Sequence, residues 1–255
     1  MKLHLAATAL LAFVAATLAR ADDYAFKEPF SQTAPFNATG SLSLANVNGN
    51  VEIRTWDKNQ ILVEGEKSAK TDEELKQIEF TIGLTDKHAG IKVDLPKRSG
   101  WWVFGNTIRA SVRFIITVPA TASIEQLQTV NSALKIEGLR GSIDAKSVNG
   151  AILATGLGGD VRLSTVNGAI DASFAVIAPQ QKLSFNTVNG SITVGLPKDA
   201  GVTLQGSVVN GRISCDFPIT LGDGGHGRTL SGTVGDGRAS LRAETVNGSI
   251  AIKQR

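Results

Sequence analysis

The sequence is poor in cysteine, and this shortage removes whole classes of protein. Its only cysteine, Cys215, excludes an intramolecular disulfide. Two cysteine ligands cannot meet, and the histidine and cysteine spacing of zinc sites is absent. Cys215 lies in a column of apolar residues, so we expect it to serve as a small core residue.

An excess of one charge is also lacking. Outside the first 21 residues, 24 basic residues stand against 23 acidic ones, a net charge of +1. A basic patch of the kind that binds nucleic acid has no support, so no nucleic-acid partner is expected. No stretch after residue 21 approaches the roughly 20 apolar residues of a membrane-spanning helix, so no membrane span is expected.

Catalytic patterns are missing as well. His88 and His226 are the only histidines after residue 21, and they lie far apart in the sequence. A Gly-x-Ser-x-Gly elbow is absent. Parallel β-helices that cleave acidic polysaccharides need carboxylates grouped on one outer face. Here acids fall in different phases of the repeat described below. We therefore predict no catalytic, cofactor-binding or metal-binding residue and no enzymatic activity.

The N-terminus has a pattern of its own. Lys2 supplies a basic start, an uncharged apolar run extends from Leu5 to Leu18, and Ala19-Arg20-Ala21 provides a small-x-small cleavage site. This order is typical of a secretory signal peptide spanning residues 1–21. No cysteine follows the run, which argues against a lipid anchor. The mature chain is expected to be exported, to the periplasm or to the outside of the cell.

What the chain does contain is a tripeptide, Val-Asn-Gly, that recurs along most of its length. A seventh copy, Val130-Asn131-Ser132, has lost its glycine. Between Asn131 and Asn210 the spacings are 18, 18, 22 and 21 residues, and the last step, of 37, is about two such periods. A fixed period in this range indicates a repeat architecture. The seven asparagines are Asn48, Asn131, Asn149, Asn167, Asn189, Asn210 and Asn247.

The residues around each asparagine alternate between apolar and variable. Around Asn167, for example, Val161 and Leu163 precede it at six and four positions, and Ile170 and Ala172 follow at three and five. A two-residue period is typical of half-buried strands. Each unit is therefore predicted to be a strand, an Asn-Gly corner and a second strand.

Two architectures contain this unit. Asn-Gly is a strong signal for a two-residue hairpin, so a meander of hairpins is one alternative. In that meander, Thr165 and its equivalents would face the core and the valines before each asparagine would face solvent. A parallel β-solenoid with a bend at the asparagine turns the valines inward and the threonines or serines outward. We favour the solenoid, in which equivalent asparagines stack about 4.8 Å apart as a hydrogen-bonded ladder.

The rest of the chain divides around these repeats. Residues 22–119 are predicted to form an N-terminal cap that includes the first strand pair around Asn48. Thr71-Asp72-Glu73-Glu74 has the pattern of a capping box that opens a helix ending near Glu79. Residues 120–255 are predicted to form the solenoid, with six or seven coils. Solenoids need covered ends, which is the role expected of the cap.

These motifs together resemble a known family. The export signal, the Leu-x-Leu-x-x-x-x-x-Gly-x-Val-x-Ile opening from Leu42 to Ile53, the strand ending in Val118-Pro119 and the serial Val-Asn-Gly-x-Ile repeats are similar to the bacterial putative-adhesin family of β-strand-repeat domains. The resemblance covers nearly all of the mature chain. It implies an all-β, right-handed β-helix-like solenoid and a setting in the cell envelope or outside the cell. It supplies no catalytic residues.

One local feature suggests a contact surface. Adjacent aromatic residues on a strand point to opposite faces, so either Trp101 or Trp102 is expected to be exposed beside Lys97 and Arg98. The alternative is that both rings pack under the cap or against another chain. The function expected overall is non-enzymatic, adhesin-like or structural presentation of a surface for glycans or envelope proteins. A polysaccharide lyase or hydrolase of β-helix type, and a periplasmic accessory or sensor protein, remain alternatives.

Overall fold

The computed structural model describes residues 24–94, 110–219, 221–224 and 227–255. The predicted signal peptide and the candidate contact residues Lys97, Arg98, Trp101 and Trp102 lie outside this part of the chain. Strands hold 66% of the described residues and one short helix holds 2%, which confirms the all-β prediction. No helix among them has the length and apolar character needed to cross a membrane.

The strands, in chain order, are β1 (Phe26–Pro35), β2 (Ser41–Ala45), β3 (Val51–Trp56), β4 (Gln60–Ala69), β5 (Glu79–Leu84), β6 (His88–Asp94), β7 (Ala110–Pro119), β8 (Ser123–Thr129), β9 (Leu134–Glu137), β10 (Ile143–Asn149), β11 (Ile152–Leu157), β12 (Val161–Asn167), β13 (Ile170–Phe174), β14 (Lys182–Asn189), β15 (Ile192–Leu196), β16 (Val202–Asn210), β17 (Ile213–Cys215), β18 (Leu221–Gly224), β19 (Gly227–Val234), β20 (Ala239–Asn247) and β21 (Ile250–Gln254). The helix α1 spans Asp72–Lys76.

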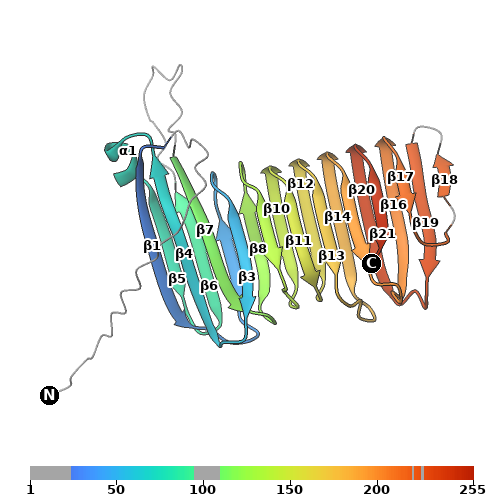
Figure 1. Ribbon diagram of the computed structural model, residues 1–255, viewed down its shortest axis with the longest axis horizontal. Helices are drawn as coiled ribbons and strands as arrows, with labels where there is room; N and C mark the ends of the chain where they lie inside the picture. Colours follow the sequence, from blue (N-terminus) through green and yellow to red (C-terminus); the bar gives the residue numbers. More distant parts are fainter. Residues whose placement is uncertain (1–23, 95–109, 220, 225–226) are drawn as a thin grey trace.

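The strands form two large mixed sheets that lie face to face in an elongated molecule (Figure 1). The first sheet has the order β1-β4-β7-β3-β9-β11-β13-β15-β21-β17. The second has the order β18-β19-β16-β20-β14-β12-β10-β8-β2-β6-β5. Apolar side chains from both sheets, such as Phe114, Leu163 and Phe185, are fully buried between them.

Each Val-Asn-Gly corner connects the two sheets. Strand β10 lies in the second sheet and β11, which follows the corner at Asn149, lies in the first. Neighbouring repeats then pair in parallel and in register, so that Asn149 lies opposite Asn167 and Asn167 opposite Asn189. The hairpin alternative is wrong, because the two strands around a corner belong to different sheets. We call each such pair of strands, with its corner, a layer.

The facing predicted for the corner residues is also wrong. The valines before the asparagines are exposed, at 41% for Val148, Val166 and Val188, whereas Thr165 and Thr187 are buried. The cause is the position of the bend. Strands β10, β12, β14 and β20 extend through the asparagine, and their side chains alternate without a break as far as the preceding valine; only the asparagine itself departs from the alternation. The chain turns one residue later than predicted, at the glycine.

The order of the layers in space differs from their order in the sequence. Strand β20 pairs in parallel with β14 on one side and with β16 on the other. Likewise β21 lies between β15 and β17. The last repeat, around Asn247, therefore lies between the layers of Asn189 and Asn210.

The long step before Asn247 is not a missed coil. The residues between hold β18 and β19, which form an antiparallel hairpin. Strand β19 also pairs antiparallel with β16, extending the second sheet beyond the last layer.

Antiparallel strands cover the other end of the stack. In the first sheet β1 pairs with β4 and β4 with β7, both antiparallel, before β7 joins β3 in parallel. In the second sheet β5 pairs antiparallel with β6. Helix α1 begins as its capping box predicts, with the Thr71 hydroxyl accepting a 3.1 Å hydrogen bond from the Glu74 N–H. It ends at Lys76, earlier than predicted.

Candidate interaction surfaces

The seven corner asparagines form a continuous chain of side-chain hydrogen bonds. In each bond the Nδ2 of one asparagine donates to the Oδ1 of the asparagine in the neighbouring layer, over 2.8–2.9 Å. At the first layer, Asn48 instead donates to the Ala110 carbonyl. The order of the layers along this ladder is Asn48, Asn131, Asn149, Asn167, Asn189, Asn247 and Asn210.

Buried hydroxyls satisfy the backbone beneath the ladder. Thr165, two residues before Asn167, donates a 3.0 Å hydrogen bond to the carbonyl of Gly150 in the preceding layer. Thr187 and Thr245 make the same bond to Gly168 and Gly190. The sequence pattern predicts that these side chains face outward, and that prediction is wrong. Because an unpaired buried carbonyl is costly, their repeated hydroxyl is the sequence signal for an inward role.

The glycine of the motif is required by close approach of the layers. A Cβ added at Gly168 would lie 2.2 Å from the carbonyl oxygen of Gly150, and one added at Gly190 would lie 1.9 Å from that of Gly168. Glycine is the residue that permits such contact between backbones. Each of these glycines also donates its N–H to the backbone carbonyl of the corner asparagine in the next layer of the stack, as Gly168 does to Asn189 at 3.0 Å.

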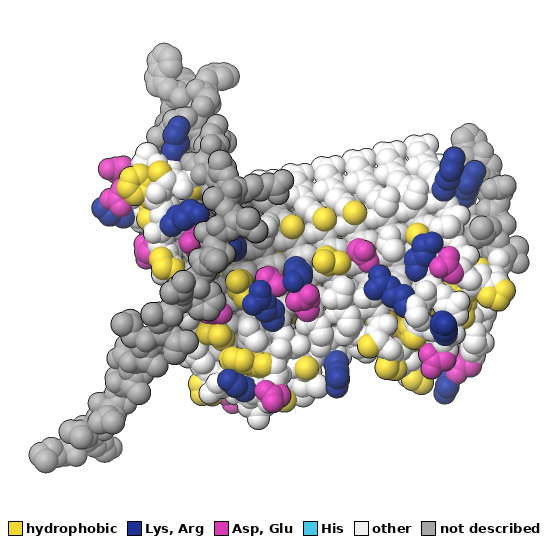
Figure 2. Space-filling view, in the orientation of Figure 1, with side chains coloured by type: hydrophobic (Ala, Val, Ile, Leu, Met, Phe, Trp, Pro, Cys, Tyr) yellow, Lys and Arg dark blue, Asp and Glu magenta, His cyan; other side chains and the backbone are white. Residues whose placement is uncertain are grey.

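Three rows of side chains therefore run along the edge of the molecule that the Val-Asn-Gly corners form. We call these three rows together the corner face. They are the exposed valines, the asparagine ladder and a row of small residues two positions after each asparagine. Figure 2 shows an area without charged side chains along the upper edge of the repeat region, above rows that carry charge. The valine row comprises Val130, Val148, Val166, Val188, Val246 and Val209, and the small-residue row comprises Ala133, Ala151, Ala169, Ser191 and Ser249.

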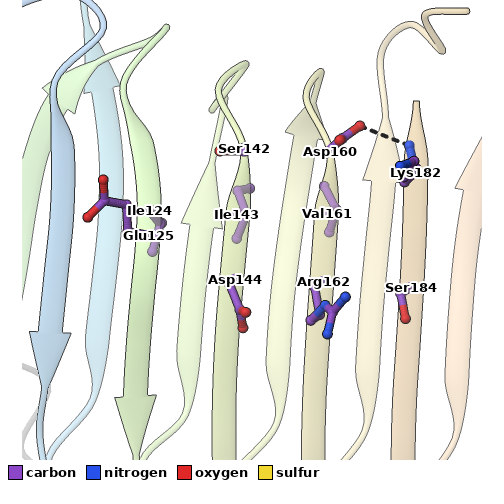
Figure 3. A pocket seen from close by; sticks show the side chains of 10 residues that line it. All are labelled: Ile124, Glu125, Ser142, Ile143, Asp144, Asp160, Val161, Arg162, Lys182 and Ser184. Atoms are coloured by element: carbon purple, nitrogen blue, oxygen red, sulfur yellow. Dashed lines mark hydrogen bonds between the residues drawn. The ribbon is translucent and has the colours of Figure 1, made fainter. Parts of the chain in front are cut away.

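A shallow polar groove crosses the outer face of the second sheet. Glu125, Asp144, Asp160, Arg162 and Lys182 line it, on strands β8, β10, β12 and β14 and the turn before β12 (Figure 3). Asp160 accepts a 2.9 Å hydrogen bond from the backbone N–H of Lys182, and Asp144 lies 3.6 Å from Lys146. Asp160 is thus held by a hydrogen bond and Asp144 lies near a cation, although Oδ1 of Asp144 accepts no hydrogen bond, and Glu125 is exposed to solvent.

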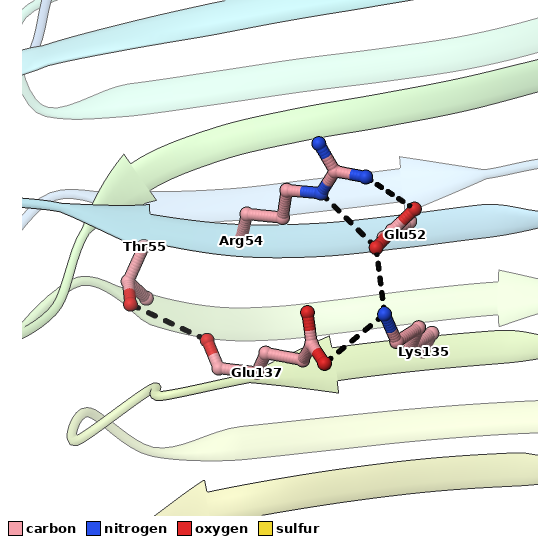
Figure 4. Close-up of polar contacts among 5 residues, drawn as sticks. All are labelled: Glu52, Arg54, Thr55, Lys135 and Glu137. Atoms are coloured by element: carbon pink, nitrogen blue, oxygen red, sulfur yellow. Dashed lines mark hydrogen bonds and ion pairs between the residues drawn. The ribbon is translucent and has the colours of Figure 1, made fainter.

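A cluster of ion pairs lies on the outer face of the first sheet. Glu52 accepts two hydrogen bonds of 3.0 Å from Arg54 and one of 2.9 Å from Lys135, which also pairs with Glu137 at 3.0 Å (Figure 4). The hydrogen bonds from Arg54 lower the pKa of the Glu52 carboxyl, partly opposed by its burial and supported by Lys135. The cluster ties strand β3 to β9 and leaves no unpaired charge to act on a substrate.

The described residues hold no group of three or more histidine, cysteine or acidic side chains placed to bind a metal ion. The imidazole of His88 contacts the Ser41 hydroxyl at 2.9 Å and Glu125 at 3.7 Å, while His226 is outside the described part of the chain. Cys215 is half-buried on the end strand β17, and burial raises the pKa of its thiol. A raised pKa disfavours the reactive thiolate.

No family model matches the chain, and no curated protein matches it. Among solved structures, a putative cell adhesion protein from Clostridium sporogenes superimposes with a TM-score of 0.52 at 16% identity, over 89% of this chain and all of that one. The two chains share a fold. At this identity the likeness extends no further than the fold.

Further neighbours have related names. A putative adhesin from Bacteroides fragilis gives a TM-score of 0.43 at 12% identity, over 88% of this chain and 97% of that one. One from Parabacteroides distasonis gives 0.31 at 11% identity, over 89% and 97%. The name of the Clostridium sporogenes structure, whose fold this chain shares, agrees with the sequence's resemblance to the putative-adhesin family.

Proposed function

We propose that the chain is an exported, non-enzymatic, adhesin-like protein that presents a long, flat surface to glycans or proteins of the cell envelope. In this proposal the stacked layers form a right-handed β-solenoid, residues 22–119 cap one end, and residues 1–21 are removed on export. The observation that carries the proposal is the corner face, where the same three side-chain positions recur from layer to layer. In the stack from the layer of Asn131 to the layer of Asn247, none of these positions holds a charged residue.

Binding is favoured over catalysis by the way the polar groups are used. The corner amides bond to one another, Asp160 of Figure 3 accepts a backbone N–H, and Glu52 and Glu137 of Figure 4 are paired with cations. General acid–base chemistry needs a positioned group whose pKa suits proton transfer. Glu52, whose pKa is lowered by Arg54, is the opposite of a proton donor.

The experiment is a binding assay with an activity control. Fluorescently labelled chain beginning at residue 22 is incubated with intact bacterial cells, isolated envelope fractions and immobilised glycans. Saturable binding to cells or envelope material, with no release of unsaturated or reducing sugars from the polysaccharides, is the expected result. Sugar release would replace this proposal by the lyase or hydrolase alternative. Absence of binding to every surface would overturn it.

A further inference from the structure

The corner face has unused hydrogen-bonding capacity at a regular spacing. A side-chain amide carries two N–H donors and an oxygen with two lone pairs. Asn149, Asn167 and Asn189 each spend one donor and one lone pair on the ladder and are exposed to solvent. Each therefore keeps one N–H and one lone pair for a ligand. Strand spacing repeats this donor–acceptor pair about every 4.8 Å along the stack.

Apolar groups lie beside these amides. Val148, Val166 and Val188 are each 41% exposed, and valine recurs at this exposed position from layer to layer. On the other side of the ladder Ala151, Ala169 and Ser191 are small and exposed, so nothing projects above the amides there. The result is a flat strip with polar groups in the middle and methyl groups along one side.

The size of the strip suits a single thin ligand. Six layers spaced about 4.8 Å apart give a length of roughly 24 Å, and three residue steps of about 3.3 Å give a width of roughly 10 Å. Such a strip covers about 240 Å², well below the roughly 800 Å² that each partner buries in a stable protein–protein interface. A second copy of the chain, docked on this face alone, is too weakly held.

Charge and spacing narrow the ligand further. The strip has no charged side chain between the layers of Asn131 and Asn247, and Arg212 stands only at its end. An anionic polymer finds no cation within the strip itself, and Lys146, which lines a shallow pocket with Val148, borders it at a single layer. An extended peptide repeats its same-side groups about every 6.6–6.8 Å, so it falls out of register with amides about 4.8 Å apart. A hexose unit in an extended β-linked chain is similar in length to the layer spacing. Alternate rings are turned over, but each ring carries hydroxyls on both of its edges, so every unit can still offer a hydroxyl to an amide.

We propose that the corner face binds an uncharged, linear glycan lying along the stack, with about one sugar unit for each layer. Sugar hydroxyls both donate and accept, which matches the free N–H and lone pair of each amide. The C–H groups of the sugar rings cover the valine methyl groups. This assignment names the ligand class for the proposed adhesin-like function and rests on it.

The test introduces charge without touching the ladder. Val166→Lys and Val188→Lys place an ammonium group in the middle of the strip at exposed positions. Leu153→Lys is the matched control, because Leu153 is equally exposed, at 39%, but lies on the outer face of the first sheet. Circular dichroism and thermal unfolding verify that all three variants fold like the parent chain.

Binding is measured by calorimetry with neutral oligosaccharides of increasing length, derived from linear β-glucan and from chitin, and with the anionic polysaccharide alginate and an extended peptide library. Affinity is expected to rise with oligosaccharide length until the layers are filled. Each valine variant is expected to bind at least about tenfold more weakly, since the charge is buried without a partner, while Leu153→Lys is unchanged.

The outcomes separate this inference from the proposed function. Tight binding of alginate or of peptides in place of neutral sugars overturns the inference, as does full binding by Val166→Lys. If the parent chain binds envelope material and neutral glycans do not compete, the inference fails and the adhesin-like function stands. If the parent chain binds no cell, envelope fraction or glycan, both fail.

Discussion

The side-chain amide of Asn247 donates a 2.8 Å hydrogen bond to Oδ1 of Asn189, which precedes it by 58 residues. The repeat that follows Asn189 in the sequence, at Asn210, bonds instead to the far side of Asn247. The layer of Asn247, the last along the sequence, therefore lies inside the ladder, between two layers that precede it in the chain. Both of its strands, β20 and β21, have partners on two sides. They therefore connect the layer of Asn210 to the layer of Asn189.

Position in the ladder sets the effect of losing an amide. Asn167→Ala removes two side-chain hydrogen bonds, to Asn149 and to Asn189, whereas Asn210→Ala removes the single bond to Asn247. At about 0.5–1.5 kcal/mol for each bond, the first change is expected to lower the free energy of unfolding by about 1–3 kcal/mol and the second by about half as much. Urea denaturation of both variants measures the difference. Equal effects would show that the ladder bonds add nothing to stability.

The corner glycines are expected to resist the smallest substitution. In Gly168→Ala the new Cβ would meet the Gly150 carbonyl oxygen at 2.2 Å, so neighbouring layers must move apart, at a cost of about 2–3 kcal/mol. Gly83→Ala, on β5, is the matched control, because its Cβ would have no neighbour nearer than 3.9 Å. Its stability is expected to stay within about 0.5 kcal/mol of the parent chain. Thermal unfolding compares the two; a tolerated Gly168→Ala would contradict the close contact of the layers.

The buried threonines test the backbone under the ladder. Thr165→Val keeps the shape of the side chain but removes the hydroxyl that donates to the Gly150 carbonyl. The carbonyl loses this partner in a buried setting, so a loss of about 1–2 kcal/mol in the free energy of unfolding is expected. Thr165→Ser keeps the hydroxyl, as Ser147 does at the equivalent position, and serves as the control. If valine were as stable as threonine here, the bond would be unimportant.

The ion pairs of Glu52 predict a loss of stability in acid. Hydrogen bonds from Arg54, and then from Lys135, lower the pKa of Glu52 in the folded chain below the value of 4.5 for an unperturbed glutamate. The stabilisation is therefore fully present above about pH 4.5 and is lost as the pH falls through the lower, folded-state pKa. Glu52→Gln is expected to be less stable than the parent chain at pH 7 and to approach it as the pH falls below 4.5 and through the folded-state pKa. A constant gap between the two unfolding curves at every pH would contradict this assignment.

The sequence predicted the local pattern well. The alternation around Asn167, with Leu163 and Ile170 inward, marks the strands because burial repeats every two residues. Residues that stand the same number of positions from their asparagine also lie opposite one another in neighbouring layers, as the pairing of β12 with β14 shows. The start of α1 follows from Thr71 and Glu74, whose capping chemistry is local.

The errors came from relationships between layers. Whether Val166 or Thr165 faces inward depends on where the chain bends, and the bend lies at Gly168, where the backbone approaches Gly150 in another layer too closely for a Cβ. Nor does any residue near Asn247 reveal that its layer lies between two earlier ones, because six of the seven repeats carry the same Val-Asn-Gly motif. The ligand class is hidden for the same reason, since the corner face exists only once the layers are stacked.

Disulfide trapping tests the stacking order most directly. In a Cys215→Ser background, Val188→Cys with Val246→Cys places two exposed thiols on adjacent strands about 4.8 Å apart, within reach of a disulfide. Val188→Cys with Val209→Cys separates them by two strand spacings, about 9.6 Å, beyond the roughly 7 Å limit between Cα atoms. Rapid intramolecular oxidation of the first pair and none of the second is the predicted result. A disulfide in the second pair and not in the first would show that the layers stack in sequence order and would contradict the account.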